Sequence, residues 1–379
     1  MGFSTKAIHA AIEPDPTYGS IMTPIHLTST YVQEELGKNK GYEYARVSNP
    51  TRTVLERQIA ALEGGKEGLA FASGMAAIST LFALLKAGDH VVASHNVYGG
   101  VYRLAQGVLS NFQLDFSFVD TTDLDNIRKA LKPSTRMVYI ETPTNPTMEV
   151  TDLNGVAKIC REKKLVSVVD NTFATPYLQS PLEHGIDIVV HSATKYLNGH
   201  SDMLGGLIVL NDKETADRLR FLQKSIGGIM SPFEAWMCLR GIKTLAVRMD
   251  RHNRNAVDIA EFLAQQGKVK KVNFPGLVSH PQHRLAKKQM RGFGGMLSFD
   301  LGTLENAKAF LKHVRLCALA ESLGGVETLI SHPATMTHSF ISPEQRKAIG
   351  IGEGLVRLSV GIEDVEDIRE DLKQALAEV

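Results

Sequence analysis

Short apolar segments alternate with amphipathic segments along most of the chain from residue 51 onward. The apolar segments are rich in Val and Ile, as at 137–141 (MVYIE) and 207–210 (LIVL). Such continuous runs are typical of strands in a sheet that is covered on both faces. The segments between them repeat apolar residues every three or four positions, which predicts helices. The alternation predicts an α/β fold with a mainly parallel, seven-stranded type of sheet and helices on both faces.

The pattern also predicts where the elements lie. The predicted strands of the first region are 69–71, 90–93, 114–119, 137–141, 166–170, 186–190 and 207–210. The predicted helices between them are 51–63, 75–86, 101–109, 123–131 and 154–163. Residues 219–262 are mostly helical in pattern, and beyond them strands at 269–273 and 296–301 alternate with helices at 304–314 and 364–378.

Three regions follow from these changes in pattern. Residues 1–50 are rich in Pro, Gly, Thr and Tyr without a sustained period, which predicts an extended N-terminal arm. Residues 51–244 form the predicted large α/β domain, and residues 245–379 a smaller C-terminal α/β domain. A chain of 379 residues is long enough for two domains of ordinary size.

The composition excludes several classes of protein. The 43% of hydrophobic residues is too high for a disordered chain. With 42 Lys and Arg against 41 Asp and Glu, the formal net charge is +1, so no global charge attracts nucleic acid or an anionic membrane. No apolar run approaches the ~18 residues of a membrane-spanning helix. The sequence also lacks a signal-peptide pattern near its start, so we expect a cytoplasmic protein.

Cysteines and histidines give no metal site. The cysteines, Cys160, Cys238 and Cys317, are widely spaced and follow no ligand pattern. That usage fits buried thiols in a reducing compartment better than disulfides. The histidines do not cluster either, and we therefore expect no metal.

Three candidate functional groups follow three predicted strands. Gly74 begins a helix and offers backbone N–H groups to an anion, or it is simply a turn glycine. Asp170 closes an apolar strand, as a cap or as a functional charge. Lys195 follows another strand, where burial lowers an amine's pKa and makes it a nucleophile, unless the side chain extends to water.

Taken together, these groups match one cofactor. The carboxyl ends of parallel strands meet at one edge of a sheet, where such folds bind ligands. Pyridoxal phosphate needs an amine for its aldehyde, an acid for its ring nitrogen and donors for its phosphate. A nucleotide-binding oxidoreductase is a competing interpretation, but the sequence has neither G-x-G-x-x-G after its first strand nor G-x-x-x-x-G-K-[ST] anywhere. A non-catalytic oligomeric scaffold that kept the fold is a third interpretation.

Ordered motifs along nearly the whole chain resemble the cysteine/methionine-metabolism family of fold-type I pyridoxal phosphate enzymes. The most specific is HSATKYLNGHSD at 191–202. The others are YEYAR at 42–46, NPTR at 49–52, SGMA at 73–76, NVYGG at 96–100, ETPTNP at 141–146, VDNTF at 169–173, ESLGG at 321–325 and RLS at 357–359.

The resemblance implies roles for cofactor-binding and catalytic residues. Lys195 matches the lysine that forms the Schiff base with pyridoxal 5'-phosphate, and Asp170 matches the acid that pairs with the pyridine nitrogen. Tyr98 matches the tyrosine that stacks on the ring and serves in acid/base steps. The implied phosphate-binding residues are Gly74, Met75, Ser192 and Thr194, with Tyr44 and Arg46 reaching the phosphate from a neighbouring subunit. The resemblance implies a homotetramer built as a dimer of active-site-sharing dimers.

The resemblance also implies an amino-acid substrate. Arg357, with Ser322 and Asn145, matches the group that holds the substrate carboxylate, for which a guanidinium fork is suited. Glu43, Arg103 and Glu327 complete the pattern of the cystathionine γ-lyase and γ-synthase branch, and the two glutamates would face the distal ammonium. This predicts a trans-sulfuration lyase or transferase of cysteine and methionine metabolism.

Within that branch the sequence slightly favours the γ-lyase, which converts cystathionine to cysteine, 2-oxobutanoate and ammonia. The γ-synthase, which joins a homoserine ester to cysteine, is the alternative. Gly99 and Gly100 follow Tyr98 where methionine γ-lyases often carry a cysteine, and that activity is therefore a poorer match, as is cystathionine β-lyase.

Overall fold

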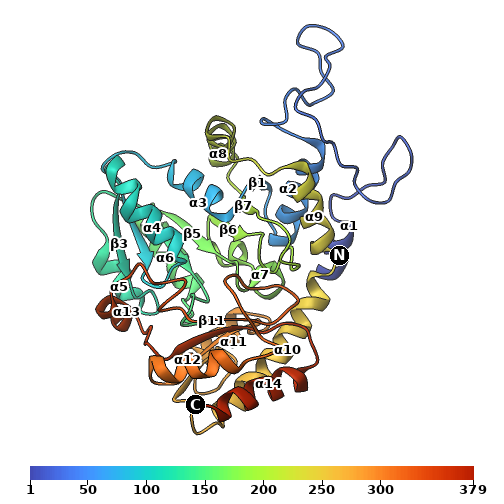
Figure 1. Ribbon diagram of the computed structural model, residues 1–379. Helices are drawn as coiled ribbons and strands as arrows, with labels where there is room; N and C mark the ends of the chain where they lie inside the picture. Colours follow the sequence, from blue (N-terminus) through green and yellow to red (C-terminus); the bar gives the residue numbers. More distant parts are fainter.

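The computed structural model describes residues 1–379 and contains two β-sheets. The first sheet has seven strands in the order β1-β7-β6-β5-β4-β2-β3 (Figure 1). They are β1 (Glu67–Phe71), β2 (His90–Ser94), β3 (Asp115–Val119), β4 (Thr135–Glu141), β5 (Val166–Asp170), β6 (Ile188–Ser192) and β7 (Gly206–Leu210). Strands β2 to β6 are parallel, and β7 is antiparallel to both β6 and β1. The predicted mainly parallel sheet is confirmed.

Helices cover both faces of this sheet. Successive residues of a strand point to opposite faces of the sheet. In β5, Val168 packs in one apolar cluster and Val169 in another, so both faces are covered. Helices α3 (Gly74–Phe82), α4 (Gly99–Gly107) and α8 (Lys213–Ile226) lie on the side of Val168. The opposite face is covered by α2 (Pro50–Glu63), α5 (Leu124–Ala130), α6 (Leu153–Lys163) and α9 (Pro232–Ile242). Burial on both faces explains why the strands carry uninterrupted Val and Ile.

Local sequence sets the ends of the helices. Helix α2 begins where the Asn49 side chain accepts hydrogen bonds from the N–H groups of Thr51 and Arg52, and it ends at Gly64 with φ +74°. Helix α8 is bounded in the same way by Asp212 and by Gly227, whose φ is +89°. Side-chain caps satisfy the first free N–H groups of a helix, and glycine adopts the left-handed conformation that ends it without strain.

The second sheet has five strands in the order β10-β11-β12-β9-β8. They are β8 (Lys271–Asn273), β9 (Met296–Asp300), β10 (Ala318–Leu319), β11 (Leu329–Ser331) and β12 (Leu355–Ser359). Only β10 and β11 are parallel. Helices α10 (Leu245–Ala264), α12 (Leu304–His313) and α14 (Val365–Ala377) share an apolar cluster with this sheet and form the layer at the bottom of Figure 1.

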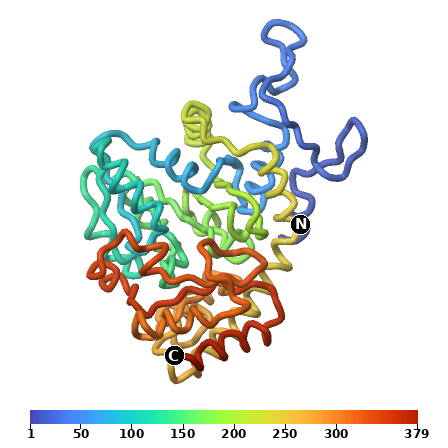
Figure 2. Tube along the Cα trace, viewed as in Figure 1, coloured from blue at the N-terminus to red at the C-terminus, as the bar shows by residue number.

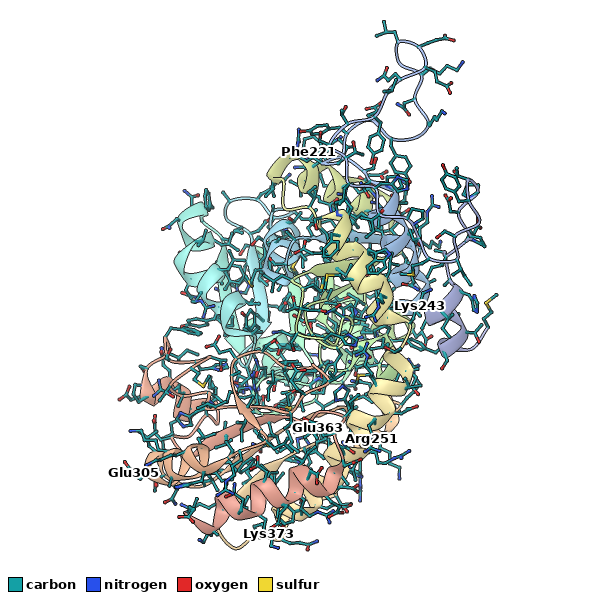
Figure 3. All side chains as sticks on the ribbon, turned by 45° about the vertical axis from the view of Figure 1, so that its right-hand side comes forward. Phe221, Lys243, Arg251, Glu305, Glu363 and Lys373 are labelled. Atoms are coloured by element: carbon teal, nitrogen blue, oxygen red, sulfur yellow. The ribbon has the colours of Figure 1, made fainter.

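Helix α10 also holds the start of α14. Figure 3 shows Arg251 of α10 beside Glu363, just before α14. The guanidinium donates hydrogen bonds to the carbonyl oxygen of Glu363 (3.1 Å) and to Oδ1 of Asp364 (3.0 Å). These contacts join the two longest helices of this half of the chain at one point.

Several elements were not predicted from the pattern. They are strands β10, β11 and β12, helices α7 (Thr175–Leu178), α11 (His283–Gln289) and α13 (Pro343–Ala348), and two 3₁₀ turns at Leu109–Phe112 and Pro181–His184. Strand β12 has the sequence LVRLS, and its buried arginine interrupts the apolar run that would have revealed it. The helix predicted at 75–86 ends earlier, at Phe82. The division of the chain at residue 244 stays a prediction.

Residues 10–49 contain no helix or strand beyond isolated bridges, and most of this arm extends away from the body of the chain (Figure 2). Residues 3–9 differ from the expected extended arm, because they form helix α1 (Phe3–His9) and bury Ala7 against α2. Several apolar side chains of the arm are exposed, among them Tyr18, Ile21, Leu27, Val32 and Leu36. No helix in the structure is both long and apolar enough to cross a membrane.

Candidate active site

A cavity of about 200 Å³ lies at the carboxyl ends of β1, β5 and β6. Both sheets contribute to its walls, because residues from β12 and the segment before β11 complete the lining. Most of the residues predicted for the site line this cavity: Gly74, Met75, Tyr98, Asn145, Asp170, Ser192, Thr194, Lys195, Ser322 and Arg357. The sequence-predicted groups are therefore brought together in one place.

The amine of Lys195 lies in the cavity and donates a hydrogen bond to Oγ of Ser322 at 2.8 Å. Burial, and to a lesser extent the neighbouring Arg357 charge, lower the pKa of this lysine to about 8, against the opposing effect of Glu321. Burial disfavours the ammonium form because the charge loses its hydration. A substantial fraction of the amine is therefore neutral, and a neutral amine is nucleophilic and basic.

The carboxylate of Asp170 lines the cavity at the end of β5. Its Oδ1 accepts a hydrogen bond from the N–H of Thr172 (3.0 Å), and its Oδ2 accepts one from the hydroxyl of Tyr139 (3.3 Å). Burial raises the pKa of Asp170, whereas the hydrogen bonds of Thr172 lower it. The structure shows no Lys or Arg paired with this carboxylate by a salt bridge. A cation placed beside it would therefore be stabilised.

An anion-binding cradle lies on one side of the cavity. Helix α3 begins at Gly74, and the first N–H groups of a helix have no partner within it. A Cβ on Gly74 would lie 3.2 Å from the Cβ of Ser192, so the missing side chain allows this close approach. The hydroxyls of Ser192 and Thr194 line the same space. Backbone N–H groups, hydroxyls and the helix dipole together suit a phosphate.

A buried guanidinium that could pair with a carboxylate lies on the other side. Arg357 is buried on β12, and its Nη1 donates to Oδ1 of Asn145 (3.0 Å) and its Nη2 to the carbonyl of Ser322 (2.8 Å). Ser322 has φ +91°, a conformation that a serine rarely adopts. Two hydrogen bonds help to hold this conformation. Lys195 donates to the hydroxyl of Ser322, and Arg357 donates to its carbonyl oxygen.

Tyr98 precedes α4, and its side chain is 42% exposed at the cavity. The two glycines after it are sterically required. A Cβ on Gly100 would lie 2.5 Å from Cε1 of Tyr98, and one on Gly99 would lie 2.7 Å from Cε1 of Phe340. The glycines therefore allow the tyrosine ring and the segment around Phe340 to pack against the start of α4.

Five predicted site residues do not line this cavity: Glu43, Tyr44, Arg46, Arg103 and Glu327. Tyr44 and Arg46 lie in the arm, where the guanidinium is 5.5 Å from the tyrosine ring and donates to the carbonyl of Lys224. Glu43 accepts a hydrogen bond from Asn39 of the same arm. Within one chain these residues are away from the site, and their assigned roles stay predictions.

Arg103 and Glu327 lie near the cavity but outside it. The Arg103 guanidinium stacks 4.9 Å from the centre of the Phe340 ring. Glu327 accepts a hydrogen bond from Ser201 and lines a second cavity of about 570 Å³. The two cavities share Thr194, Leu204, Glu321 and Ser322, so they adjoin. The second cavity is strongly acidic: its lining includes no lysine or arginine but the carboxylates of Asp202, Glu234, Glu321 and Glu327.

Sequence reasoning missed several residues at the site. Glu141 and Glu321 line the cavity and belong to quoted motifs, but no role was assigned to them. Tyr139, which donates to Asp170, had no signal at all because it occupies an apolar strand position. Thr337 lines the cavity from the segment after β11, which the pattern left without structure.

These groups fit pyridoxal phosphate. The buried Asp170 carboxylate suits a protonated ring nitrogen, the Lys195 amine suits an aldehyde, and the Gly74 cradle suits a phosphate. No group of three or more His, Cys, Asp or Glu side chains is arranged to hold a metal ion.

Comparisons with known proteins agree with this chemistry. A family model described as "Cys/Met metabolism PLP-dependent enzyme" matches residues 4–377. A protein named cystathionine β-lyase from Coxiella burnetii is 53% identical over 98% of this chain and 97% of its own length. One named cystathionine γ-lyase from Bacillus subtilis is 50% identical over the full length of both. The crystal structure of cystathionine γ-lyase from Lactobacillus plantarum complexed with L-serine superposes with a TM-score of 0.98 and 46% identity, covering 100% of this chain and 99% of that one.

Proposed function

Because the chain belongs to the Cys/Met metabolism PLP-dependent enzymes, we propose that it cleaves cystathionine at the γ-carbon, releasing cysteine, 2-oxobutanoate and ammonia. The family and the relatives establish the coarser class: the protein is a pyridoxal-phosphate-dependent carbon–sulfur lyase. The finer choice depends on the residues of the two adjoining cavities.

Each group of the first cavity has a task in this reaction. Bound pyridoxal phosphate supplies the electron sink for the carbanion that forms when the substrate Cα loses its proton. With this cofactor bound, Asp170 would hold the protonated ring nitrogen, and Gly74 with Ser192 would hold the phosphate. Lys195 takes the proton from Cα and then moves a proton at Cβ, so that the sulfur on the γ-carbon leaves.

Arg357 with Asn145 would hold the substrate carboxylate, and Tyr98 would lie against the cofactor ring. A guanidinium binds a carboxylate through two parallel hydrogen bonds and thereby fixes the orientation of the amino acid. This orientation places Cα toward Lys195, whose amine is separated from Arg357 only by their common partner Ser322. Proton transfer needs this placement more than it needs extra binding energy.

The acidic second cavity carries the proposal that the substrate is cystathionine. Cystathionine is a thioether with an amino acid at each end, so its distal end brings a second ammonium group. Glu321 lies in both cavities, and Glu327, Asp202 and Glu234 surround the space beyond it. A cavity lined by four carboxylates and by no lysine or arginine favours an ammonium, whereas methionine would place a methyl group there.

Product analysis with cystathionine as the sole substrate tests the proposal. Cysteine with 2-oxobutanoate supports γ-cleavage. Homocysteine with pyruvate would contradict it and establish the β-lyase activity named for the Coxiella burnetii relative. Cystathionine formed from a homoserine ester plus cysteine, with no cleavage of cystathionine alone, would instead establish the γ-synthase.

We also propose that the protein is a homotetramer of site-sharing dimers, in which the arm of one subunit brings Tyr44 and Arg46 to the phosphate of the next. Exposed apolar side chains in the arm support burial against another copy. Mixing inactive Arg46→Ala and Lys195→Ala subunits tests it, because hybrid dimers regain one intact site. No recovery of activity after subunit exchange, or a monomeric mass by light scattering, would contradict it.

A further inference from the structure

Glu141 is a buried carboxylate in the wall of the first cavity, and the reaction described above does not use it. It is the last residue of β4 and lies opposite Asp170 in the parallel pairing of β4 with β5. Burial and the neighbouring Asp170 raise the pKa of the Glu141 carboxyl well above its usual range. A second acid beside Asp170 therefore costs stability, and its presence calls for a physical reason.

The two oxygens of this carboxylate bind two separate segments of backbone. Oε2 accepts a hydrogen bond from the N–H of Tyr98 at 2.7 Å, and Oε1 accepts one from the N–H of Asn145 at 3.1 Å. Tyr98 has no side-chain cap for the helix it precedes. Of the side chains of this size, only a carboxylate presents two acceptor oxygens, since an amide presents one oxygen and one donor.

The two segments have different partners in the site. Tyr98 is the residue assigned to the cofactor ring, and Asn145 accepts from Arg357, the residue assigned to the substrate carboxylate. Glu141 is itself fixed by the sheet, and its N–H donates to Oγ of Ser94 on the adjacent strand β2 at 3.3 Å. One rigid side chain thus sets the distance between the ring-binding and the carboxylate-binding residues.

We propose that Glu141 is a positioning residue. It connects the backbone of Tyr98, the residue assigned to the cofactor, to the backbone of Asn145, which binds the substrate-assigned Arg357. It touches neither the breaking bond nor the transferred protons. Its effect is to hold both backbones in the geometry that cofactor and amino acid require together. This inference rests on the proposed function for the roles of Tyr98, Asn145 and Arg357.

The test compares Glu141→Gln with the wild type in two binding measurements without turnover. The first is the dissociation constant of pyridoxal phosphate from the cofactor-free protein. The second is the dissociation constant of glycine, an amino acid without a leaving group, followed by the absorbance change of the holoenzyme. An amide accepts only one of the two N–H bonds, and its NH2 group faces the other N–H donor, so the side chain must shift away from both segments. We therefore expect both constants to rise about tenfold.

Three further variants make the outcome specific. Asn145→Ala is expected to weaken glycine binding alone, and Tyr98→Ala chiefly to weaken cofactor binding. Glu149→Gln is the matched control: Glu149 lies a few residues along the same loop, where it accepts from His95 and Asn96 but not from Tyr98 or Asn145. Glu149→Gln is expected to lower the unfolding temperature, as the loss of a purely structural carboxylate would. Both of its dissociation constants are expected to stay within about twofold of the wild-type values.

If Glu141→Gln changes only one of the two constants, or neither, the proposal is wrong. If that variant does not fold, Glu141→Asp serves instead, because it keeps both oxygens on a stem shorter by one carbon and is expected to weaken both ligands in parallel. Since neither measurement requires cleavage, a different reaction by the wild type would overturn the proposed function and leave this test intact.

Discussion

The guanidinium of Arg357 lies 3.0 Å from Oδ1 of Asn145, although the two residues come from the strands and loops of different sheets. Asn145 follows β4 of the seven-stranded sheet, and Arg357 lies on β12 of the five-stranded sheet. The carboxylate-binding group therefore forms only where the two sheets pack against each other. Movement of one sheet relative to the other would disturb this contact and also the hydrogen bond from Lys195 to Ser322.

Replacing Arg357 with lysine should weaken substrate binding selectively. Lysine keeps the charge but loses the planar fork, and a hydrogen bond to a charged group contributes about 1.5–3 kcal/mol. We expect KM for cystathionine to rise roughly 10- to 100-fold, with a smaller fall in kcat. Steady-state kinetics measure both values, and a change confined to kcat would contradict the assignment.

Lys195 should carry the cofactor. After reduction with borohydride, digestion and mass spectrometry, the tagged peptide should contain residue 195, and Lys195→Ala should lose the absorbance near ~420 nm and at least about 100-fold in kcat. Lys373→Ala, which removes an exposed side chain of α14, is the control and should keep full activity. A tag on another lysine would refute the assignment.

The pH dependence of cofactor capture follows from the lowered pKa of Lys195. Only the neutral amine attacks an aldehyde, and it predominates above the pKa of about 8. The rate at which the cofactor-free protein takes up pyridoxal phosphate should therefore rise with pH and level off above about 8. In Glu321→Gln the midpoint of this rate–pH curve should move to lower pH, because the Glu321 charge raises the pKa of Lys195. Stopped-flow absorbance measures the rate, and a midpoint near 10 would contradict the prediction.

Gly206→Ala should displace the start of helix α3, where Gly74 contributes to the predicted phosphate site. A Cβ at this position of β7 would lie 2.2 Å from the carbonyl oxygen of Ser73 and 2.9 Å from Cα of Gly74. Because both are backbone atoms, the start of α3 must shift, at a cost of about 1–3 kcal/mol. We expect a lower unfolding temperature and roughly tenfold weaker cofactor binding. Gly107→Ala on α4, where a Cβ meets nothing within 4 Å, is the control.

Removing the Glu63 side chain should destabilise the chain without opening the site. Its Oε1 accepts from Nε2 of His191 (2.5 Å) and from Nδ2 of Asn171 (3.0 Å), and all three side chains are fully buried. Glu63→Ala leaves two donors without an acceptor, which should cost about 3–5 kcal/mol of unfolding free energy. Glu63→Gln keeps one acceptor oxygen, and its unfolding free energy should therefore fall less. Denaturant unfolding of both variants measures the difference.

The strands of the seven-stranded sheet could be predicted from sequence because burial on both faces demands uninterrupted apolar residues. Lys195 and Asp170 were visible for the same reason, because Asp170 closes one such run and Lys195 follows another after four residues. Strand β12 could not be predicted, since its central residue is Arg357, whose burial depends on partners far away in sequence. Tyr139 was hidden in the same way, as an aromatic residue in a core strand.

The roles of the arm residues could be obtained only from the family resemblance. Neither Glu43 nor Arg46 contacts the cavity within its own chain, and both side chains are exposed. Nothing within a single chain assigns a partner to either of these two side chains. Glu141 illustrates another limit, since its motif was recognised but its two backbone partners depend on the tertiary structure.

Strand β12 is the last strand along the chain, yet it lies between β11 and β9 in its sheet. Proteins emerge from the ribosome N-terminal end first, and their domains fold in that order. A nascent chain therefore has Gly74, Asp170 and Lys195 available before Arg357 has been synthesised. The wall of the cavity that holds Arg357 is therefore completed last, after β12 has been inserted between β11 and β9.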